Sequence, residues 1–473
     1  MTSGPDVTRL AREALAGAAP TVFWLDDPQR PAPQPALAGD GTADLVVVGG
    51  GYTGLWTALL ARERRPYRSV TLLEAGLCGW EASGRNGGFA SASLTHGFSN
   101  GRERWPEELA ELNRLGAENL AAIGRTVADL GIDCGWEETG ELTVATRPHE
   151  LEELRALAGE MTAAGHEVEL LDAAAVRAEV DSPTYLGGLR ERNGTALVEP
   201  ARLAWGLRRA CLAAGVTIHE RTRVTGLARD GAGLRVGTTG GASLRAGRVA
   251  LATNAFPPLL RRLRLATVPV YDHVLVTEPL SAAQLASVGW AGRQGVGDAA
   301  NRFHYYRLTR DSRILWGGYD ATYHYGSRIA PELEQRDATH ERLAEHFFTT
   351  FPQLAGLGFT HRWGGVIDTC TRFAAFYGTA YAGRAAYALG YTGLGVAASR
   401  FGAQVLLDHL DGADTERTRL RMVRERPLPF PPEPLRWAGV RLTAWSLGRA
   451  DERAGRRNAW LRALDRAWLG FDS

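Results

Sequence analysis

The sequence contains no lysine, because all 54 of its basic residues are arginine. Without a lysine ε-amine the chain cannot form the Schiff base that holds pyridoxal phosphate, or that of a lysine-type aldolase. The lysine of a phosphate-binding P-loop is also missing. Three large classes of enzyme are therefore excluded, although the bias towards arginine is itself the mark of a GC-rich genome.

Cysteine is scarce as well. The chain has four cysteines, which lie far apart and form no C-x-x-C pair: Cys78, Cys134, Cys211 and Cys370. This spacing signals neither a zinc site nor a disulfide framework, so no metal site is expected. A reducing cytoplasm is the simplest location for such a chain.

Long apolar runs and an excess of one charge are also missing. Residues 1–42 contain no secretory signal, and no run of about 18 apolar residues predicts a transmembrane helix. The formal net charge is +1, which favours no nucleic-acid partner. At 473 residues the chain is long enough for two or three domains.

A glycine-rich turn follows the first buried strand. The β-branched run at 45–48 ends at G-G-G-Y-T-G (49–54), which has the G-x-G-x-x-G spacing and opens a helix. In a dinucleotide site Gly49 permits the tight turn, Gly51 lets the pyrophosphate approach, and Gly54 lets helix and strand pack closely. The helix N-terminus supplies free N–H groups for phosphates. The cofactor contacts expected here are Gly49, Gly51, Tyr52, Thr53 and Gly54.

Two later segments extend this site and favour FAD. A second strand ends at Glu74, 20 residues after Gly54, where a carboxylate would bind ribose hydroxyls and repel a 2′-phosphate. The polar segment 83–88 could wrap a pyrophosphate and the flavin edge with backbone N–H groups, and Arg85 adds charge. The contacts expected here are Glu74, Ala75, Ser83, Gly84, Arg85, Asn86, Gly87 and Gly88.

These segments resemble the D-amino-acid oxidase (DAO) superfamily of FAD enzymes. Within it they are most similar to the γ-glutamylputrescine oxidase and glycine/sarcosine oxidase-like branch. The resemblance covers roughly residues 20–410. Its further motifs are V-E-P-A-R-L (198–203), A-T-N-A (252–255), T-E-P-L (277–280), W-G-G (363–365) and G-Y-T-G-L-G-V (390–396). None of them specifies a substrate.

The resemblance implies an α/β fold. A Rossmann-type FAD-binding domain would carry an inserted α+β substrate domain built on a mixed or antiparallel sheet, followed by a helical C-terminal tail. The expected division is an N-terminal arm (1–42), the FAD-binding domain (43–100, 195–260 and 361–410), the substrate domain (101–194 and 261–360) and the tail (411–473). Helices are predicted over 101–130, 150–180 and 201–214, and strands over 267–277, 303–309 and 313–318.

The resemblance also implies a reaction. Hydride leaves the carbon next to an amine nitrogen for the flavin, the imine hydrolyses to a carbonyl and an amine, and oxygen or another carrier reoxidises the flavin. FAD is expected to be non-covalent, because Cys370 lies in no matching attachment motif. The family's histidine in the last motif is replaced by Leu394. Further cofactor contacts are expected at Val224, Thr253, Gly393, Leu394, Gly395 and Val396.

The substrate residues are the least specified part of the site. The candidate catalytic residues are Tyr306, Arg307, Asp368 and His273. Tyr306 and Arg307 follow each other on a strand, so only one of them can face a given cavity. The arginine that clamps an amino acid's carboxylate in glycine and D-amino-acid oxidases is missing near Asp368, which favours an amine substrate. Amino-acid oxidation remains the alternative. The lysine that promotes reaction with oxygen in sarcosine oxidases is missing too, so arginine or histidine replaces it or the acceptor is not oxygen.

The tail has a composition of its own. Residues 411–473 hold thirteen arginines and nine acidic residues, with a stiff Pro-rich connector at 427–432. Its tryptophans are Trp437, Trp445, Trp460 and Trp468. We interpret it as a helical appendage docked on the protein. A membrane-surface helix that serves electron transfer to quinone is one alternative, and a flavoprotein with a binding or assembly role is another.

Overall fold

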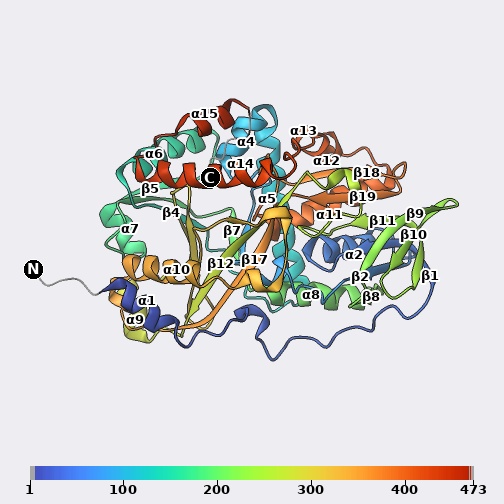
Figure 1. The fold of residues 1–473 in the computed structure, drawn as a ribbon, viewed down its shortest axis with the longest axis horizontal. Coiled ribbons are helices and arrows are strands. Elements are labelled where there is room, and N and C mark those ends of the chain that lie inside the picture. The colour runs from blue at the N-terminus through green and yellow to red at the C-terminus, as the bar shows by residue number, and fades with distance from the viewer. Residues whose placement is uncertain (1–5, 468, 470–473) are drawn as a thin grey trace, which may run out of the picture.

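Two β-sheets lie side by side in the computed structural model, which describes residues 6–467 and 469. The first sheet occupies the right of Figure 1 and the second the left. The chain passes between them several times, which agrees with an inserted substrate domain. The fold is the predicted α/β type.

The first sheet follows from the β-branched and apolar strand residues near the N-terminus. Its strands are β1 (Gly41–Val48), β2 (Val70–Leu73), β8 (Thr217–His219), β9 (Val224–Asp230), β10 (Gly233–Thr238), β11 (Ser243–Leu251), β18 (Phe376–Ala380) and β19 (Ala385–Leu389). Within the described residues their order is β18-β19-β11-β1-β2-β8, and β10 and β9 extend β11. β1 runs parallel to both β11 and β2, and Val46 and Val47 in it are fully buried. This is the parallel core of a dinucleotide-binding domain.

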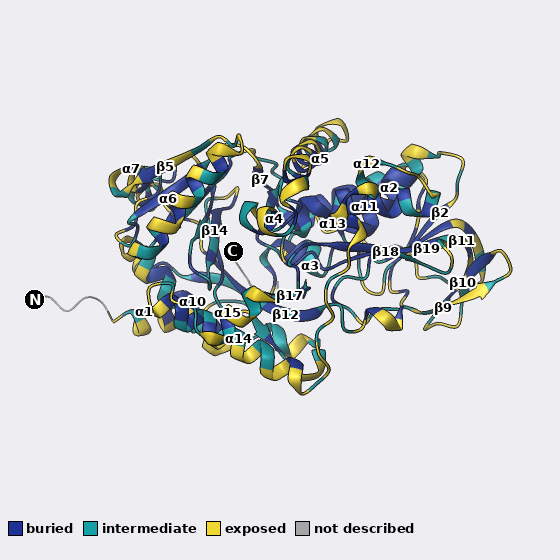
Figure 2. Ribbon diagram, turned by 90° about the horizontal axis from the view of Figure 1, so that it is seen from above, coloured by how far each residue is buried: buried dark blue, intermediate teal, exposed yellow. Residues whose placement is uncertain are grey.

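Helices of differing character accompany the first sheet. They are α2 (Tyr52–Arg64), α3 (Ala82–Arg85), α4 (Phe98–Arg104), α5 (Leu109–Asp129), α8 (Pro200–Ala213), α11 (Gly395–Asp411), α12 (Glu416–Arg419) and α13 (Arg421–Arg424). α2 packs against α8 and α11, and Leu55 and Trp56 on it are fully buried. Figure 2 shows α2 and α11 as the most deeply buried helices of this half.

The second sheet forms the substrate side. Its strands are β4 (Glu141–Ala145), β5 (Val168–Asp172), β6 (Gly187–Glu191), β12 (Val268–Thr277), β13 (Gly295–Asp298), β14 (His304–Leu308), β15 (Ile314–Gly318), β16 (Thr322–Tyr323) and β17 (Phe359–Thr369). Among the described residues the order is β16-β12-β15-β14-β13-β4-β6-β5, and β17 also pairs with β12. The flanking helices are α1 (Val7–Leu15), α6 (Pro148–Ala163), α7 (Ala173–Glu179), α9 (Ala282–Val288) and α10 (Asp337–Thr350). A short pair, β3 (Phe89–Ser91) with β7 (Thr195–Leu197), forms a separate ladder.

Two local expectations were wrong. The stretch 150–180, predicted as helix, contains β5 between α6 and α7, because β5 finds a hydrogen-bonding partner in β6. β17 falls mostly in a segment assigned to the FAD-binding domain, yet it pairs with β12 in the second sheet. In both cases the pairing partner is remote in sequence, and the local pattern does not reveal it.

The tail ends in α14 (Leu435–Glu452) and α15 (Ala459–Arg466). The Asp451 carboxylate holds α14 in place by accepting hydrogen bonds from the backbone N–H groups of Asn301 (3.0 Å) and Arg302 (3.2 Å). Trp468 lies outside the described residues. Within the part of the chain that is described, no helix is long and apolar enough to cross a membrane.

Candidate flavin and substrate site

A cavity of about 2300 Å³ lies between the two sheets. One end is lined by the glycine turn after β1 and by the loop that opens α11. The other end is lined by residues of β4, β12 and β14, and residues of α14 and α15 close one side. The cavity therefore joins the predicted cofactor site to the second sheet.

The glycine turn has the close backbone contacts that the motif predicts. Gly49 has φ +110°, and a Cβ there would lie 2.3 Å from the carbonyl oxygen of Ala252. A Cβ on Gly54 would lie 1.8 Å from the Gly49 carbonyl oxygen, so helix and strand pack as expected. A Cβ on Gly51 would lie 2.9 Å from Ser83 Oγ.

Two helices begin at the cavity without a side-chain cap. The N-cap residue of α2 is Gly51 and that of α11 is Leu394, and neither provides a capping hydrogen bond. Tyr52 N, the first N–H of α2, is bound to Ser83 Oγ, but the following N–H groups of α2, the first ones of α11 and the positive ends of both helix dipoles remain available to a ligand. Phosphate and carbonyl oxygens of FAD suit such donors, so the residues present fit the cofactor.

The two ends of the cofactor site are linked directly. Thr53 Oγ1, in the first turn of α2, donates to the Tyr391 hydroxyl in the loop before α11 (3.0 Å). Tyr52 N donates to Ser83 Oγ at 2.9 Å, which ties α2 to the 83–88 segment. The expected contacts that line the cavity are Gly49, Gly51, Tyr52, Thr53, Glu74, Ala75, Ser83, Arg85, Asn86, Gly87, Val224, Thr253, Gly393, Leu394, Gly395 and Val396.

Glu74 lies where the sequence places it. Its carboxylate accepts hydrogen bonds from the N–H groups of Gly50 and Gly76, both at 2.6 Å. Burial raises the pKa of this carboxyl above its usual value. The side chain thus braces the glycine turn as well as lining the cavity.

Three expected contacts lie behind the cavity wall. Gly54, Gly84 and Gly88 do not line the cavity, and each approaches backbone atoms too closely for any side chain. Arg85 does line it, but its Nη1 is bound to Glu334 at 2.6 Å. Because its charge is already paired, we withdraw the expectation that Arg85 supplies free positive charge to the pyrophosphate.

Three catalytic candidates are packed away from the cavity. The Tyr306 hydroxyl bonds to that of Tyr185 at 2.6 Å in the core of the second sheet. Arg307 donates to the carbonyl of Val198 at 2.8 Å, and His273 is fully buried with its ring 5.3 Å from that of His340. None of the three lines the cavity, so we withdraw them as substrate contacts.

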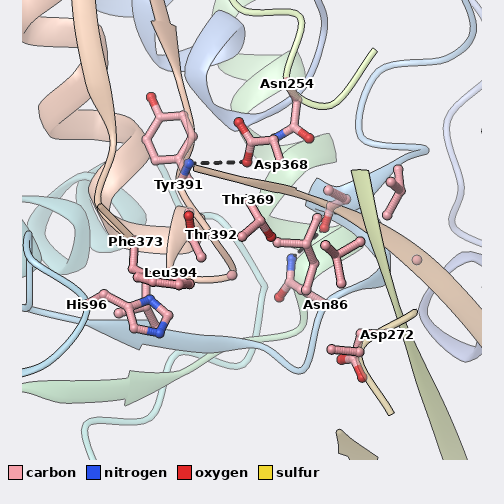
Figure 3. Close-up of a pocket in the computed structure, with 18 of the residues that line it drawn as sticks. Asn86, His96, Asn254, Asp272, Asp368, Thr369, Phe373, Tyr391, Thr392 and Leu394 are labelled. Carbon is pink, nitrogen blue, oxygen red and sulfur yellow. Dashed lines mark hydrogen bonds between the residues drawn. The ribbon is translucent and has the colours of Figure 1, made fainter. Parts of the chain in front are cut away.

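Asp368 lines the cavity but has another role. Its carboxylate accepts hydrogen bonds from the N–H groups of Gly390 and Tyr391, the latter at 3.2 Å (Figure 3). Burial raises the pKa of Asp368 to about 7. Because its oxygens hold the loop before α11, we withdraw it as the partner of a substrate amine.

Several cavity residues were not found from the sequence. The Tyr305 hydroxyl donates to Asp272 at 2.6 Å, and burial raises the pKa of Asp272 to about 6. Glu141 and Glu191 lie opposite each other on β4 and β6. Burial raises the pKa of Glu191 to about 7, and the neighbouring Glu141 charge adds to the effect. Isolated acids in strands resemble solvent-facing residues, so no local signal marks them.

His96 is a further cavity residue without a motif. Figure 3 shows it next to Leu394 and Phe373 at the cofactor end. Its backbone has φ +60°, and burial lowers its pKa to about 4, so the imidazole is neutral near pH 7. It places an imidazole beside the loop from which the family's histidine is missing.

Comparisons with known proteins agree with this geometry. The family model described as DAO, FAD dependent oxidoreductase, matches residues 44–409. Gamma-glutamylputrescine oxidoreductase of Escherichia coli K12 is 32% identical over 408 residues, covering 84% of this chain and 89% of the relative. Sarcosine oxidase subunit beta of Rhodobacter capsulatus is 25% identical over 340 residues, covering 69% and 74%.

A solved structure shares the fold. Glycine oxidase from Geobacillus kaustophilus superposes with a TM-score of 0.66 at 20% identity, covering 79% of this chain and 96% of that one. The uncapped helix starts, the glycine turn and the family match point to the same cofactor. The chain belongs to the DAO family of FAD-dependent oxidoreductases.

Proposed function

We propose that the protein oxidises the C–N bond of a primary or secondary amine to an imine, which water hydrolyses to a carbonyl compound and an amine. FAD accepts the hydride that leaves the carbon next to nitrogen. The similarity to gamma-glutamylputrescine oxidoreductase supports an amine substrate. The acceptor that reoxidises FAD is oxygen in this proposal, and a quinone is the alternative.

The charges of the cavity wall are the main support. Glu141, Glu191 and Asp272 line the cavity, and among the described residues no salt bridge within 4.0 Å joins any of them to an arginine or histidine. Two of the arginines that line the cavity are already engaged: Arg342 binds Asp320, and Arg302 donates to the Tyr319 hydroxyl at 2.6 Å. A cationic substrate would therefore meet carboxylates without cationic partners.

The same carboxylates suit the proton chemistry. An ammonium nitrogen has no lone pair, so the amine must lose a proton before hydride can leave the adjacent carbon. Carboxyls such as Asp272 and Glu191, with pKa values of about 6 and about 7, are poised to take up a proton near neutral pH. Their role would be to bind the cation and to receive its proton.

Oxidation of an amino acid is the second candidate. Arg336 lines the cavity and donates to Thr322 Oγ1 at 2.7 Å, and no described carboxylate lies within ion-pair distance of it. It could bind a substrate carboxylate. The similarity to sarcosine oxidase subunit beta supports this reading.

Anaerobic bleaching of the flavin by a panel of amines and amino acids separates the two. We expect cationic amines to reduce the flavin. Glu141→Gln and Glu191→Gln should each raise their apparent Kd at least tenfold, because a charge-assisted contact contributes about 1.5–3 kcal/mol. Glu169→Gln is the control, since that exposed acid pairs with Arg192 outside the cavity. Reduction by amino acids alone, lost in Arg336→Gln, would refute the amine proposal.

A further inference from the structure

The N-terminal arm, residues 6–42, connects the two halves of the molecule. Its helix α1 packs on α10, and Ala19 N donates to the Thr360 carbonyl of β17 at 2.8 Å. Further along, Leu37 N donates to Thr222 Oγ1 at 3.0 Å beside the first sheet. The arm is the dark blue trace that runs along the lower edge of Figure 1.

Between these contacts the arm reaches the back of the 83–88 segment. Trp24 is 5% exposed, and its indole Nε1 donates to the carbonyl of Asn86 at 3.0 Å. Trp24 does not line the cavity, whereas Asn86 does. The indole therefore holds the loop from the side opposite the cofactor site.

Two more buried donors bind the same loop from behind. Trp363 Nε1 of β17 donates to the carbonyl of Arg85 at 2.9 Å. Arg307 Nη1 of β14 donates to the carbonyl of Gly88 at 3.4 Å, and its guanidinium carbon lies 5.8 Å from the centre of the Trp24 ring. Like Trp24, neither of these side chains lines the cavity.

The planarity of the peptide gives this arrangement a consequence. In a trans peptide the carbonyl of one residue and the N–H of the next point in opposite directions. Because the Arg85 and Asn86 carbonyls accept from the buried tryptophans, the N–H groups of Asn86 and Gly87 point away from these tryptophans. Within the described residues no hydrogen bond engages either N–H group.

We propose that Trp24, Trp363 and Arg307 are positioning residues of the FAD site, which hold the 83–88 segment so that the Asn86 and Gly87 N–H groups face the cofactor. Docking of the N-terminal arm and binding of FAD are then coupled. The arm is part of the cofactor site and more than an appendage.

Trp24→Phe tests the proposal, because it removes the indole N–H and keeps an aromatic ring. Titration of the apoprotein with FAD should show a Kd about fivefold higher, as expected for one neutral hydrogen bond. Trp290→Phe is the matched control: its buried indole also donates to a carbonyl, that of Gln294 at 3.0 Å, but in the second sheet's core. Both variants should lose similar stability as apoproteins in urea.

Hydrogen exchange adds a readout that does not depend on a variant. FAD added to the apoprotein should slow exchange in the arm around residues 19–25 and in the 83–88 segment. An FAD affinity and flavin absorption spectrum in Trp24→Phe that match those of Trp290→Phe, with arm exchange insensitive to FAD, would overturn the proposal. No amine substrate is needed, so the outcome does not depend on the proposed reaction.

Discussion

Neighbouring residues on one strand of the second sheet face different surroundings. On β14, Tyr305 lines the cavity and bonds to Asp272, whereas Tyr306 points into the core and bonds to Tyr185. Arg307 shares the face of Tyr305 but lies under the backbone of Gly88. The alternation therefore places in the cavity wall Tyr305, the residue just before the two that the sequence suggested.

At the residue scale, Glu74→Gln should weaken FAD binding. The Glu74 carboxylate accepts hydrogen bonds from the N–H groups of Gly50 and Gly76. In the glutamine variant one of these two N–H groups would face the NH2 group of the new side chain, which cannot accept a hydrogen bond. We expect Kd for FAD to rise by about fivefold or more, since each such contact contributes about 1–2 kcal/mol. Titration of the apoprotein with FAD measures it, and an unchanged Kd would remove Glu74 from the site.

Gly51→Ala should yield protein that is largely free of FAD. The backbone of Gly51 has φ −80°, which any residue adopts, so the substitution causes no backbone strain. Its effect is a steric clash, because the new Cβ would lie 2.9 Å from Ser83 Oγ. That displacement disturbs the hydrogen bond from Tyr52 N and fills the ligand side of the turn. The ratio of flavin to protein absorbance reports the loss. Gly159→Ala, where a Cβ meets open space, should keep its flavin.

At the scale of elements, two short contacts hold the walls of the cavity. Asp368 at the end of β17 holds the loop that leads into α11, and Asp451 holds α14 to the loop before β14. Each is an acid bound to backbone N–H groups, a strong and directional contact. Loss of either contact should displace the element that it holds, the loop before α11 or α14, while the two sheets stay intact.

Asp368→Asn should alter the pH dependence of stability. The folded pKa of Asp368 is raised to about 7 from 3.8, so its contribution to stability is present below about pH 4 and is lost as pH rises through 7. Asparagine does not titrate. The free energy of unfolding of the wild type minus that of the variant should therefore fall between pH 4 and 7, by at most about 1.4 kcal/mol per pH unit. Urea unfolding across that range measures it, and a flat difference would contradict the raised pKa.

Asp451→Ala should loosen the cover over the cavity. It removes the acceptor for the N–H groups of Asn301 and Arg302, so α14 should leave its place more often. We expect iodide to quench flavin fluorescence more strongly and trypsin to cleave the tail about tenfold faster. The neighbouring Glu452→Ala removes only an exposed contact with Arg449 and is the control. Equal behaviour of the two variants would show that Asp451 does not anchor the tail.

At the scale of the molecule, FAD should be held without a covalent bond to cysteine. All four cysteines are buried and none lines the cavity, and burial raises the pKa of Cys370 above its usual value. Acid precipitation should therefore release yellow FAD into the supernatant. Flavin that remains in the pellet would show covalent attachment.

The sequence was most informative where function depends on local geometry. The turn at 49–54, Glu74 and the loop before α11 could be predicted because each needs particular residues at fixed spacing. The acids of the second sheet could not, since Glu141 and Glu191 meet only when β4 pairs with β6. Trp24 belongs to the same class: its partner Asn86 lies 62 residues away.

The path of the N-terminal arm also bears on how the chain is made. The arm leaves the ribosome before the strands on which it docks, and Asp26 meets His361, 335 residues further along the chain. At about 5–20 residues per second, that partner emerges roughly 15–70 s later. During this interval the arm has no complete docking surface, and the Trp24 indole lacks the neighbours that it packs against in the folded protein, such as Trp363. The arm can thus complete the proposed cofactor site only after the segment that contains His361 has been made.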